Sequence, residues 1–262
     1  MTLNKYFYIT RTNFVNSVAY IQDIIGSSAF IALIIFIFVN LWKVIYGSNE
    51  YINGFTIIMM LWYLVMTESI VTSQSRVLEE MGNEVINGNI ANYLNKPYNY
   101  VLYKYFQSLG RSVVKFIVTF VIAGLVVYIF IGPININLIT ILPIILIVFL
   151  AITLNFLIMA SLGVFAFWIE DAKSLDFVYS KIIFTIGGML VPLEIFPKWL
   201  YNISIYLPFS YVAYYPAKLF VAFDYMLFFK VLIVELMWIT VFAIIASMLY
   251  KICVKRISIN GG

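Results

Sequence analysis

Long apolar stretches, broken only by short polar ones, are the feature that most constrains this chain. Stretches such as residues 24–44 and 113–131 match the roughly 20 residues that an α-helix needs to cross a bilayer. Hydrophobic residues make up 64% of the chain and charged residues 11%, whereas soluble domains average about 45–50% and about 25%. A water-soluble fold cannot hide that much apolar surface. The sequence therefore predicts an all-α polytopic membrane protein, because helices satisfy their own backbone hydrogen bonds in lipid.

Six of the apolar segments are expected to cross the membrane. The expected spans are residues 24–44, 52–75, 113–131, 139–168, an irregular fifth from 177 to about 193, and 228–250. We expect no cleaved signal peptide, because the first segment is long enough to span and others follow it. The only cysteine is Cys253, so no internal disulfide is possible. Residues 1–262 are therefore expected to form a single transmembrane domain.

Two further segments are expected to lie at the membrane surfaces. In residues 1–22, apolar side chains recur every three or four positions, which is typical of an interfacial helix with its apolar face toward lipid. Residues 192–218 are rich in aromatics and contain four prolines, each of which removes a backbone donor. Irregular backbone at membrane depth has to be covered by protein or water, and Tyr and Trp prefer the headgroup level. We therefore expect residues 192–218 to form a re-entrant outer segment of short, broken helices.

The distribution of Lys and Arg predicts the orientation. With six spans and the N-terminus inside, twelve of the sixteen basic residues lie on the inner side. The four on the outer side are Lys43, Lys198, Lys218 and Lys230. This asymmetry agrees with the positive-inside rule, whereas seven spans would place the basic C-terminal tail outside. We predict a multi-pass protein of the cell membrane with both termini in the cytoplasm.

Several kinds of chemistry are missing from the sequence. The chain has no histidine and one cysteine, which excludes His-based triads, His metal sites and thiolate metal clusters. It has no Gly-Lys dipeptide and therefore no phosphate-binding loop of the G-x-x-x-x-G-K-[ST] kind. We expect no catalytic residues, no metal site and no cofactor in this chain.

The polar segment of residues 76–112 lies between the second and third expected spans. Its apolar positions Ile86, Ile90, Tyr93 and Leu94 fall on one helical stripe, and asparagines lie off that stripe. A short helix with two such faces can lie in a groove on a partner protein. An interfacial helix that covers lipid headgroups has the same pattern. The residues alone leave both interpretations open.

Three segments resemble those of ABC-2 type ABC transporter permeases, in the subgroup with six spans and a separate ATPase. Residues 85–97, VINGNIANYLNKP, resemble an I-x-x-G-x-I-x-x-x-L-x-x-P segment of that family. Residues 187–200, GGMLVPLEIFPKWL, continue through LPF at 207–209 and YP at 215–216, and are similar to the outer segment after the fifth span. Residues 167–172, FWIEDA, resemble the loop after the fourth span. The resemblance covers most of the chain.

The resemblance implies a permease subunit that moves a substrate out of the cytoplasm by alternating access. Separate cytosolic ATPase subunits would bind ATP and Mg and dock on a coupling helix. A second permease subunit, identical or related, would complete the path, and no nucleic acid is involved. The implied docking residues are Asn87, Gly88, Asn89, Ile90, Asn92, Tyr93, Leu94 and Pro97. The implied second cytosolic contact is Glu170, Asp171 and Lys173, and the implied outer gate is Pro192, Phe196, Pro197, Pro208 and Phe209.

Three polar side chains lie inside expected spans, namely Glu68, Asn155 and Glu235. A carboxylate within the membrane is unfavourable and usually faces a cavity or a partner, so these residues are candidates for the translocation path. The alternative is a neutral acid, or an acid hydrogen-bonded to a neighbouring helix.

Two other functions stay open at this point. An ion-coupled transporter without an ATPase would use Glu68 and Glu235 as its titrating groups. A non-transporting membrane scaffold or immunity protein would produce no flux under any energy source.

Overall fold

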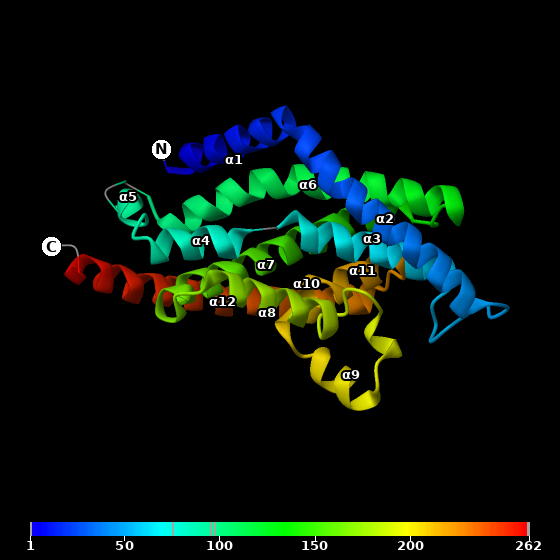
Figure 1. Ribbon diagram of the computed structural model, residues 1–262. Coiled ribbons are helices and arrows are strands. Elements are labelled where there is room, and N and C mark those ends of the chain that lie inside the picture. The colour runs from blue at the N-terminus through cyan, green and yellow to red at the C-terminus, as the bar shows by residue number, and fades with distance from the viewer. Residues whose placement is uncertain (1, 75, 95, 97, 261–262) are drawn as a thin grey trace.

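The structure, a computed structural model, describes residues 2–74, 76–94, 96 and 98–260. This part of the chain consists of α-helices and short 3-10 turns, and contains no β-strand. The long helices run roughly side by side, and loops join them at both ends of the bundle (Figure 1). The predicted fold class, an all-α polytopic membrane protein, is confirmed.

Five helical segments of the described chain are long and apolar enough to cross a membrane. They are α2 (Ile21–Tyr46), α3 (Ile57–Ser73) together with α4 (Val77–Ile86), α6 (Tyr100–Phe130), α7 (Ile141–Ile169) with the 3-10 turn η1 (Leu138–Thr140), and α12 (Tyr225–Asn260).

The fifth expected span, residues 177 to about 193, overlaps α8 (Ala172–Thr185), which is only 14 residues long. At 1.5 Å per residue it measures about 21 Å, less than the roughly 30 Å of a hydrocarbon core. The helix ends before Gly188, whose φ of +72° belongs to the left-handed region. A count of six spans therefore stays a prediction.

Helix α6 differs most from the expected boundaries. It begins at Tyr100, well before the expected start at residue 113, and the side chain of Asn99 caps it by accepting the Leu102 N–H at 3.1 Å. Helix α1 packs against the polar residues before 113, and Lys104 and Arg111 pair with Glu84 and Glu80 of α4. The helix therefore extends past its apolar part into the polar segment.

Helix α1 (Thr2–Ala19) packs along the first half of α6 (Figure 1). The Thr10 hydroxyl donates to the Phe106 carbonyl at 3.1 Å, and the rings of Tyr6 and Phe106 stack with centroids 5.0 Å apart. A Cβ atom at Gly110 would lie 2.4 Å from the Thr10 carbonyl oxygen, so the two backbones touch. The placement of residues 1–22 in the lipid interface stays a prediction.

Helix α7 is buried over much of its length and contacts α4, α8, α10 and α12. It approaches α4 closely where Gly82 meets Ala166 and Gly163 meets the Leu78 carbonyl. Small residues at a crossing let helix backbones approach closely in membrane proteins. This packing fixes the position of α4 on the bundle.

The proline-rich outer segment is divided into η2 (Leu193–Ile195), α9 (Lys198–Ser204), α10 (Pro208–Val212) and α11 (Tyr214–Val221). Residues 210–217 are buried, and α10 and α11 pack against α7 and α3. Helix α9 projects from the bundle and exposes Trp199 (Figure 1). The protein itself thus covers the irregular backbone of α10 and α11, while entry of the segment into a leaflet stays a prediction.

Candidate functional site

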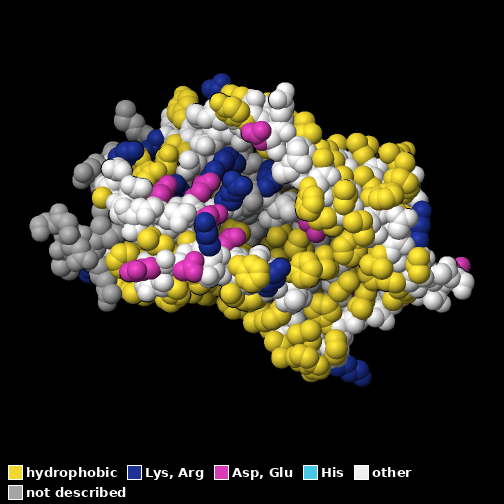
Figure 2. All heavy atoms as spheres, in the orientation of Figure 1, with side chains coloured by type: hydrophobic (Ala, Val, Ile, Leu, Met, Phe, Trp, Pro, Cys, Tyr) yellow, Lys and Arg dark blue, Asp and Glu magenta, His cyan; other side chains and the backbone are white. Residues whose placement is uncertain are grey.

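One end of the bundle gathers most of the charged side chains. The start of α1, the short helix α5 (Ala91–Leu94), the α7–α8 turn and the last turns of α12 all lie there (Figure 1). Figure 2 shows Lys, Arg, Asp and Glu side chains concentrated over this end, and apolar side chains covering most of the rest of the visible face. A surface of this composition fits water and a soluble partner better than lipid.

Where a coupling helix is expected, residues 87–94 form a turn followed by the four residues of α5. Helix α4 ends at Ile86, and Gly88 adopts a φ of +68°. The N–H of Gly88 donates to the Val85 carbonyl at 3.2 Å, and the N–H of Ile90 donates to the Glu84 carbonyl at 3.0 Å. A left-handed residue interrupts an α-helix, so the apolar stripe of the sequence spreads over two short helices.

This turn has an exposed side and a buried side. Asn87, Asn89 and Asn92 are exposed, whereas Ile90 is fully buried and Tyr93 is half-buried. Of the other predicted docking residues, Pro97 and the Leu94 side chain lie outside the described residues. The exposed side of the turn therefore offers uncharged amide groups.

Four side chains hold the turn to the bundle, and we call them the anchor cluster: Glu84, Tyr93, Tyr100 and Lys104. Lys104 donates to Glu84 Oε1 at 2.6 Å, and the Tyr100 hydroxyl donates to Oε2 at 2.7 Å. The Tyr93 hydroxyl lies 3.4 Å from Oε1, and its ring is 5.3 Å from the Lys104 ammonium. Burial and the Glu84 charge raise the pKa of Tyr93 to about 12, so its hydroxyl stays protonated at neutral pH.

The anchor cluster connects four helices. Glu84 belongs to α4, Tyr93 to α5, and Tyr100 and Lys104 to α6, while the Tyr250 ring of α12 stacks on Tyr100 at 5.7 Å. The Lys104 side chain is only 5% exposed, so solvent screens this ion pair little. These contacts connect α5 to α6 and α12.

A second ion pair holds α4 to α6. Both guanidinium nitrogens of Arg111 lie 2.9 Å from the two oxygens of Glu80, in a bidentate arrangement. Glu80 and Glu84 are one helical turn apart and share a face of α4. Local sequence patterns do not reveal these ion pairs, because the paired residues are 31 and 20 positions apart in the chain.

The predicted second cytosolic contact lies beside α4. Glu170 and Lys173 are exposed, and Asp171 caps α8 by accepting the Ser174 N–H at 3.0 Å. A Cβ atom at Gly82 would lie 2.5 Å from the Ala172 Cβ atom, so this loop touches α4. The structure thus brings the predicted contacts to the same end of the molecule.

The Asp171 cap predicts a pH dependence. The hydroxyl of Ser174, followed by its N–H, holds the pKa of Asp171 below the ordinary value of 3.8. A lowered pKa in the folded state contributes stability above pH 3.8, which is lost as the pH falls through the folded value. In melting experiments between pH 3 and 6, Asp171→Asn keeps an N-cap and should lose less stability on acidification than the wild type. An equal acid sensitivity of the two proteins would contradict this role of Asp171.

The predicted path residues lie on three different helices. Glu68 in α3, Asn155 in α7 and Glu235 in α12 are all buried. Asn155 accepts a hydrogen bond from the Tyr179 hydroxyl, whereas the Glu235 carboxyl oxygens have no hydrogen-bond partner among the described residues. No hydrogen bond joins any two of the three in the part of the chain that the structure describes. Their role in a path stays a prediction.

The predicted outer-gate residues differ in their exposure. Pro192 and Pro208 are buried, Phe196 and Phe209 are half-buried, and Pro197 is exposed. Their role as a gate stays a prediction.

A polar cluster around Glu194, not predicted from the sequence, holds the proline-rich segment in place. Lys218 donates to Glu194, and the Tyr214 hydroxyl donates to Glu194 Oε1 at 2.6 Å. The side chain of Asn53, between α2 and α3, donates to the Glu194 carbonyl at 3.1 Å. The outer segment is thus tied to the loop that precedes α3.

The fold and this charged end define the class: a multi-pass helical membrane protein with a charged, polar surface at one end. A family model described as ABC-2 family transporter protein matches residues 18–261. The chain therefore belongs to the ABC-2 transporter family, which confirms the resemblance of the three motifs. No curated protein matches the chain.

Proposed function

We propose that this chain is the permease subunit of an ATP-driven exporter. It works with separate cytosolic ATPase subunits and a second permease subunit, and its termini lie in the cytoplasm. Membership of the ABC-2 family supports the permease role. The lack of a G-x-x-x-x-G-K-[ST] loop supports the assignment of ATP binding to a partner.

The observation that carries the proposal is an exposed turn that buried side-chain contacts hold to the helix bundle. Asn87, Asn89 and Asn92 face outward, while Ile90 and the anchor cluster hold the turn from behind. A site that has to transmit force needs both accessibility and stiffness, because a loosely held loop would yield without moving the helices. Amide groups provide adaptable hydrogen bonding to a partner surface.

The mechanism follows from these connections. ATP binding draws the ATPase subunits together and displaces the turn. The anchor cluster passes this motion to α6 and α12, and the contact of Gly82 with α7 passes it to the core. The inner helix ends then shift, and cargo leaves past the outer segment, whose Glu194 contacts hold it at rest.

Asn89→Glu is expected to uncouple transport from ATP. A new carboxylate at the exposed turn has to be desolvated when the partner docks, which costs about 1–3 kcal/mol and weakens docking about five- to a hundredfold. Expression and melting temperature should stay unchanged, because Asn89 is exposed. The measurement is ATP-dependent export, together with co-purification of the ATPase.

The control is Asn49→Glu, which introduces the same charge at an exposed site in the α2–α3 loop at the opposite end. It should transport like the wild type. Unchanged ATP-dependent transport by Asn89→Glu would contradict the docking surface. Transport driven by an ion gradient alone, and abolished by Glu68→Gln, would favour the ion-coupled alternative.

A further inference from the structure

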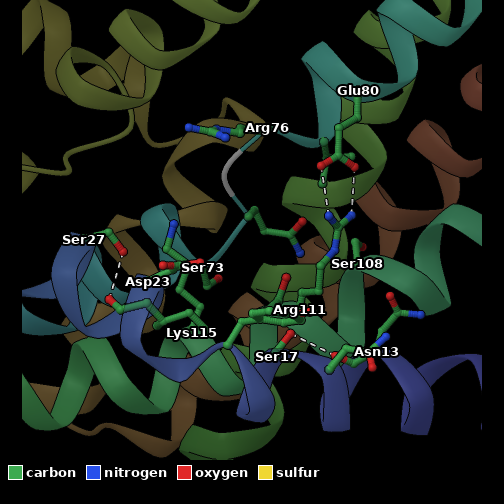
Figure 3. A pocket seen from close by; sticks show the side chains of 16 residues that line it. Asn13, Ser17, Asp23, Ser27, Ser73, Arg76, Glu80, Ser108, Arg111 and Lys115 are labelled. Atoms are coloured by element: carbon green, nitrogen blue, oxygen red, sulfur yellow. Dashed lines mark hydrogen bonds and ion pairs between the residues drawn. The ribbon is translucent and has the colours of Figure 1, made fainter.

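A polar cavity of about 560 Å³ lies between α1, the start of α2, the α3–α4 break and α6 (Figure 3). Three basic side chains contribute to its wall, Arg76, Arg111 and Lys115, together with the acids Asp23 and Glu80. Most of the remaining lining residues are Asn, Ser and Gln. The cavity contains none of the predicted docking residues and no member of the anchor cluster. Its volume is in the range of small-ligand sites.

The charges around this cavity favour an anion. Arg111 and Lys115 lie one turn apart on α6 and share a face, and Arg76 enters from the start of α4 (Figure 3). Like charges around one cavity repel each other unless anions lie between them. Glu80 supplies part of that neutralisation, but its bidentate pair uses only two of the five N–H donors of Arg111. Three basic and two acidic side chains leave a net positive charge.

The cavity lies at the boundary between the apolar and polar parts of three helices, α2, α3 and α6. Ile24, in the first turn of α2, lines it together with Ser73 and Gln74, which end α3. Lys115 immediately precedes the apolar part of α6. With spans at residues 24–44, 52–75 and 113–131, as the sequence predicts, this is the level of the lipid phosphate groups, on the side of the bundle that carries α5. Basic pockets between membrane helices on the cytoplasmic side bind lipid headgroups.

We propose that this cavity binds a phosphate-bearing group at the inner membrane surface, with Arg76, Arg111 and Lys115 as its donors. The level of the cavity favours the phosphodiester of a lipid headgroup, and inorganic phosphate has the same chemistry in soluble form. The proposal does not depend on the ATPase partner, so the chain can be tested by itself. Failure of the exporter assignment would leave it standing.

The test is a titration of the purified full chain, in a nonionic detergent, with short-chain phosphatidylglycerol or with inorganic phosphate. A saturable rise in melting temperature is expected with the lipid. Arg76→Asn should weaken the apparent affinity by about tenfold or more, the loss expected for one charge-assisted hydrogen bond. Arg76 is exposed and has a φ of +74°, which Asn tolerates, so this variant removes the charge with little effect on the backbone.

Two controls accompany the titration. Arg76→Lys keeps the charge and should retain most of the affinity. Lys230→Gln removes an exposed cation near the start of α12 and should bind like the wild type. A rise in melting temperature with inorganic phosphate that is weaker in Arg76→Asn would also support the site. It would show that free phosphate can occupy the cavity. No saturable rise with either probe, or a rise that Arg76→Asn leaves unchanged, would overturn the proposal.

Discussion

Replacing Lys104 with methionine is expected to lower the free energy of unfolding by about 3 kcal/mol, the lower end of the range for breaking a buried ion pair. The lower end applies because Glu84 is 22% exposed and keeps the Tyr100 hydrogen bond. Methionine fills a similar volume, so the loss comes from the Glu84 charge that remains without its cation. Chemical unfolding of the purified protein in detergent measures it.

The double variant Lys104→Met/Glu84→Gln separates charge from packing. It removes the stranded carboxylate, so it should recover a substantial part of the stability that Lys104→Met loses. Lys230→Met is the matched control at an exposed position and should change stability by less than about 0.5 kcal/mol. If the double variant were as unstable as the sum of its single variants, the anchor cluster would not work as a charge pair.

The second large effect is expected at the α4–α7–α8 contact. A Cβ atom at Gly82 would lie 2.5 Å from the Ala172 Cβ atom and 3.2 Å from the Ala166 Cβ atom. Real Cβ atoms do not approach this closely, so α8 or α7 has to move away from α4. Gly82→Leu should therefore destabilise the protein by about 3 kcal/mol or more, the upper part of the range for overpacking. It should also reduce ATP-coupled transport, because the shifted α4 carries the docking turn.

The controls for Gly82 use the same chemistry elsewhere. Gly26→Leu in α2 meets nothing within 4 Å of its Cβ position and should be neutral or slightly stabilising, since leucine favours helix. Gly82→Ala should already be destabilising, and Ala172→Gly should partly rescue it by removing the atom that it strikes. Equal stability of Gly82→Leu and Gly26→Leu in unfolding experiments would refute the close contact.

The boundaries of the helices show how far local sequence patterns extend. Apolar length correctly located α2, α6, α7 and α12. It placed the start of the third span at residue 113 because the residues before it are polar, yet α6 begins at Tyr100. Packing against α1 and the ion pairs with α4 favour a helix in that polar part, and a hydropathy pattern contains no information about such contacts.

The candidate site was predictable only in part. The motif at residues 85–97 marked the turn, but a single helix was expected where Gly88 divides the segment in two. The outward-facing asparagines follow from the stripe that their apolar neighbours form. That stripe does not predict the ion-pair partners of Glu80 and Glu84, because many other Lys and Arg residues along the chain could have paired with them.

By itself, the sequence determined that the chain folds in a lipid bilayer, that it is helical and that it has no G-x-x-x-x-G-K-[ST] loop. It also marked the polar segment of residues 76–112 as the one most suited to binding a partner. These follow from composition and short-range spacing, which act within one helix. The tertiary structure alone decided that Lys104 meets Glu84, that Gly82 meets Ala172, and that Arg76 shares a cavity with Arg111 and Lys115. Such pairings depend on which faces of separate helices come together, and that is settled by the packing of the whole bundle.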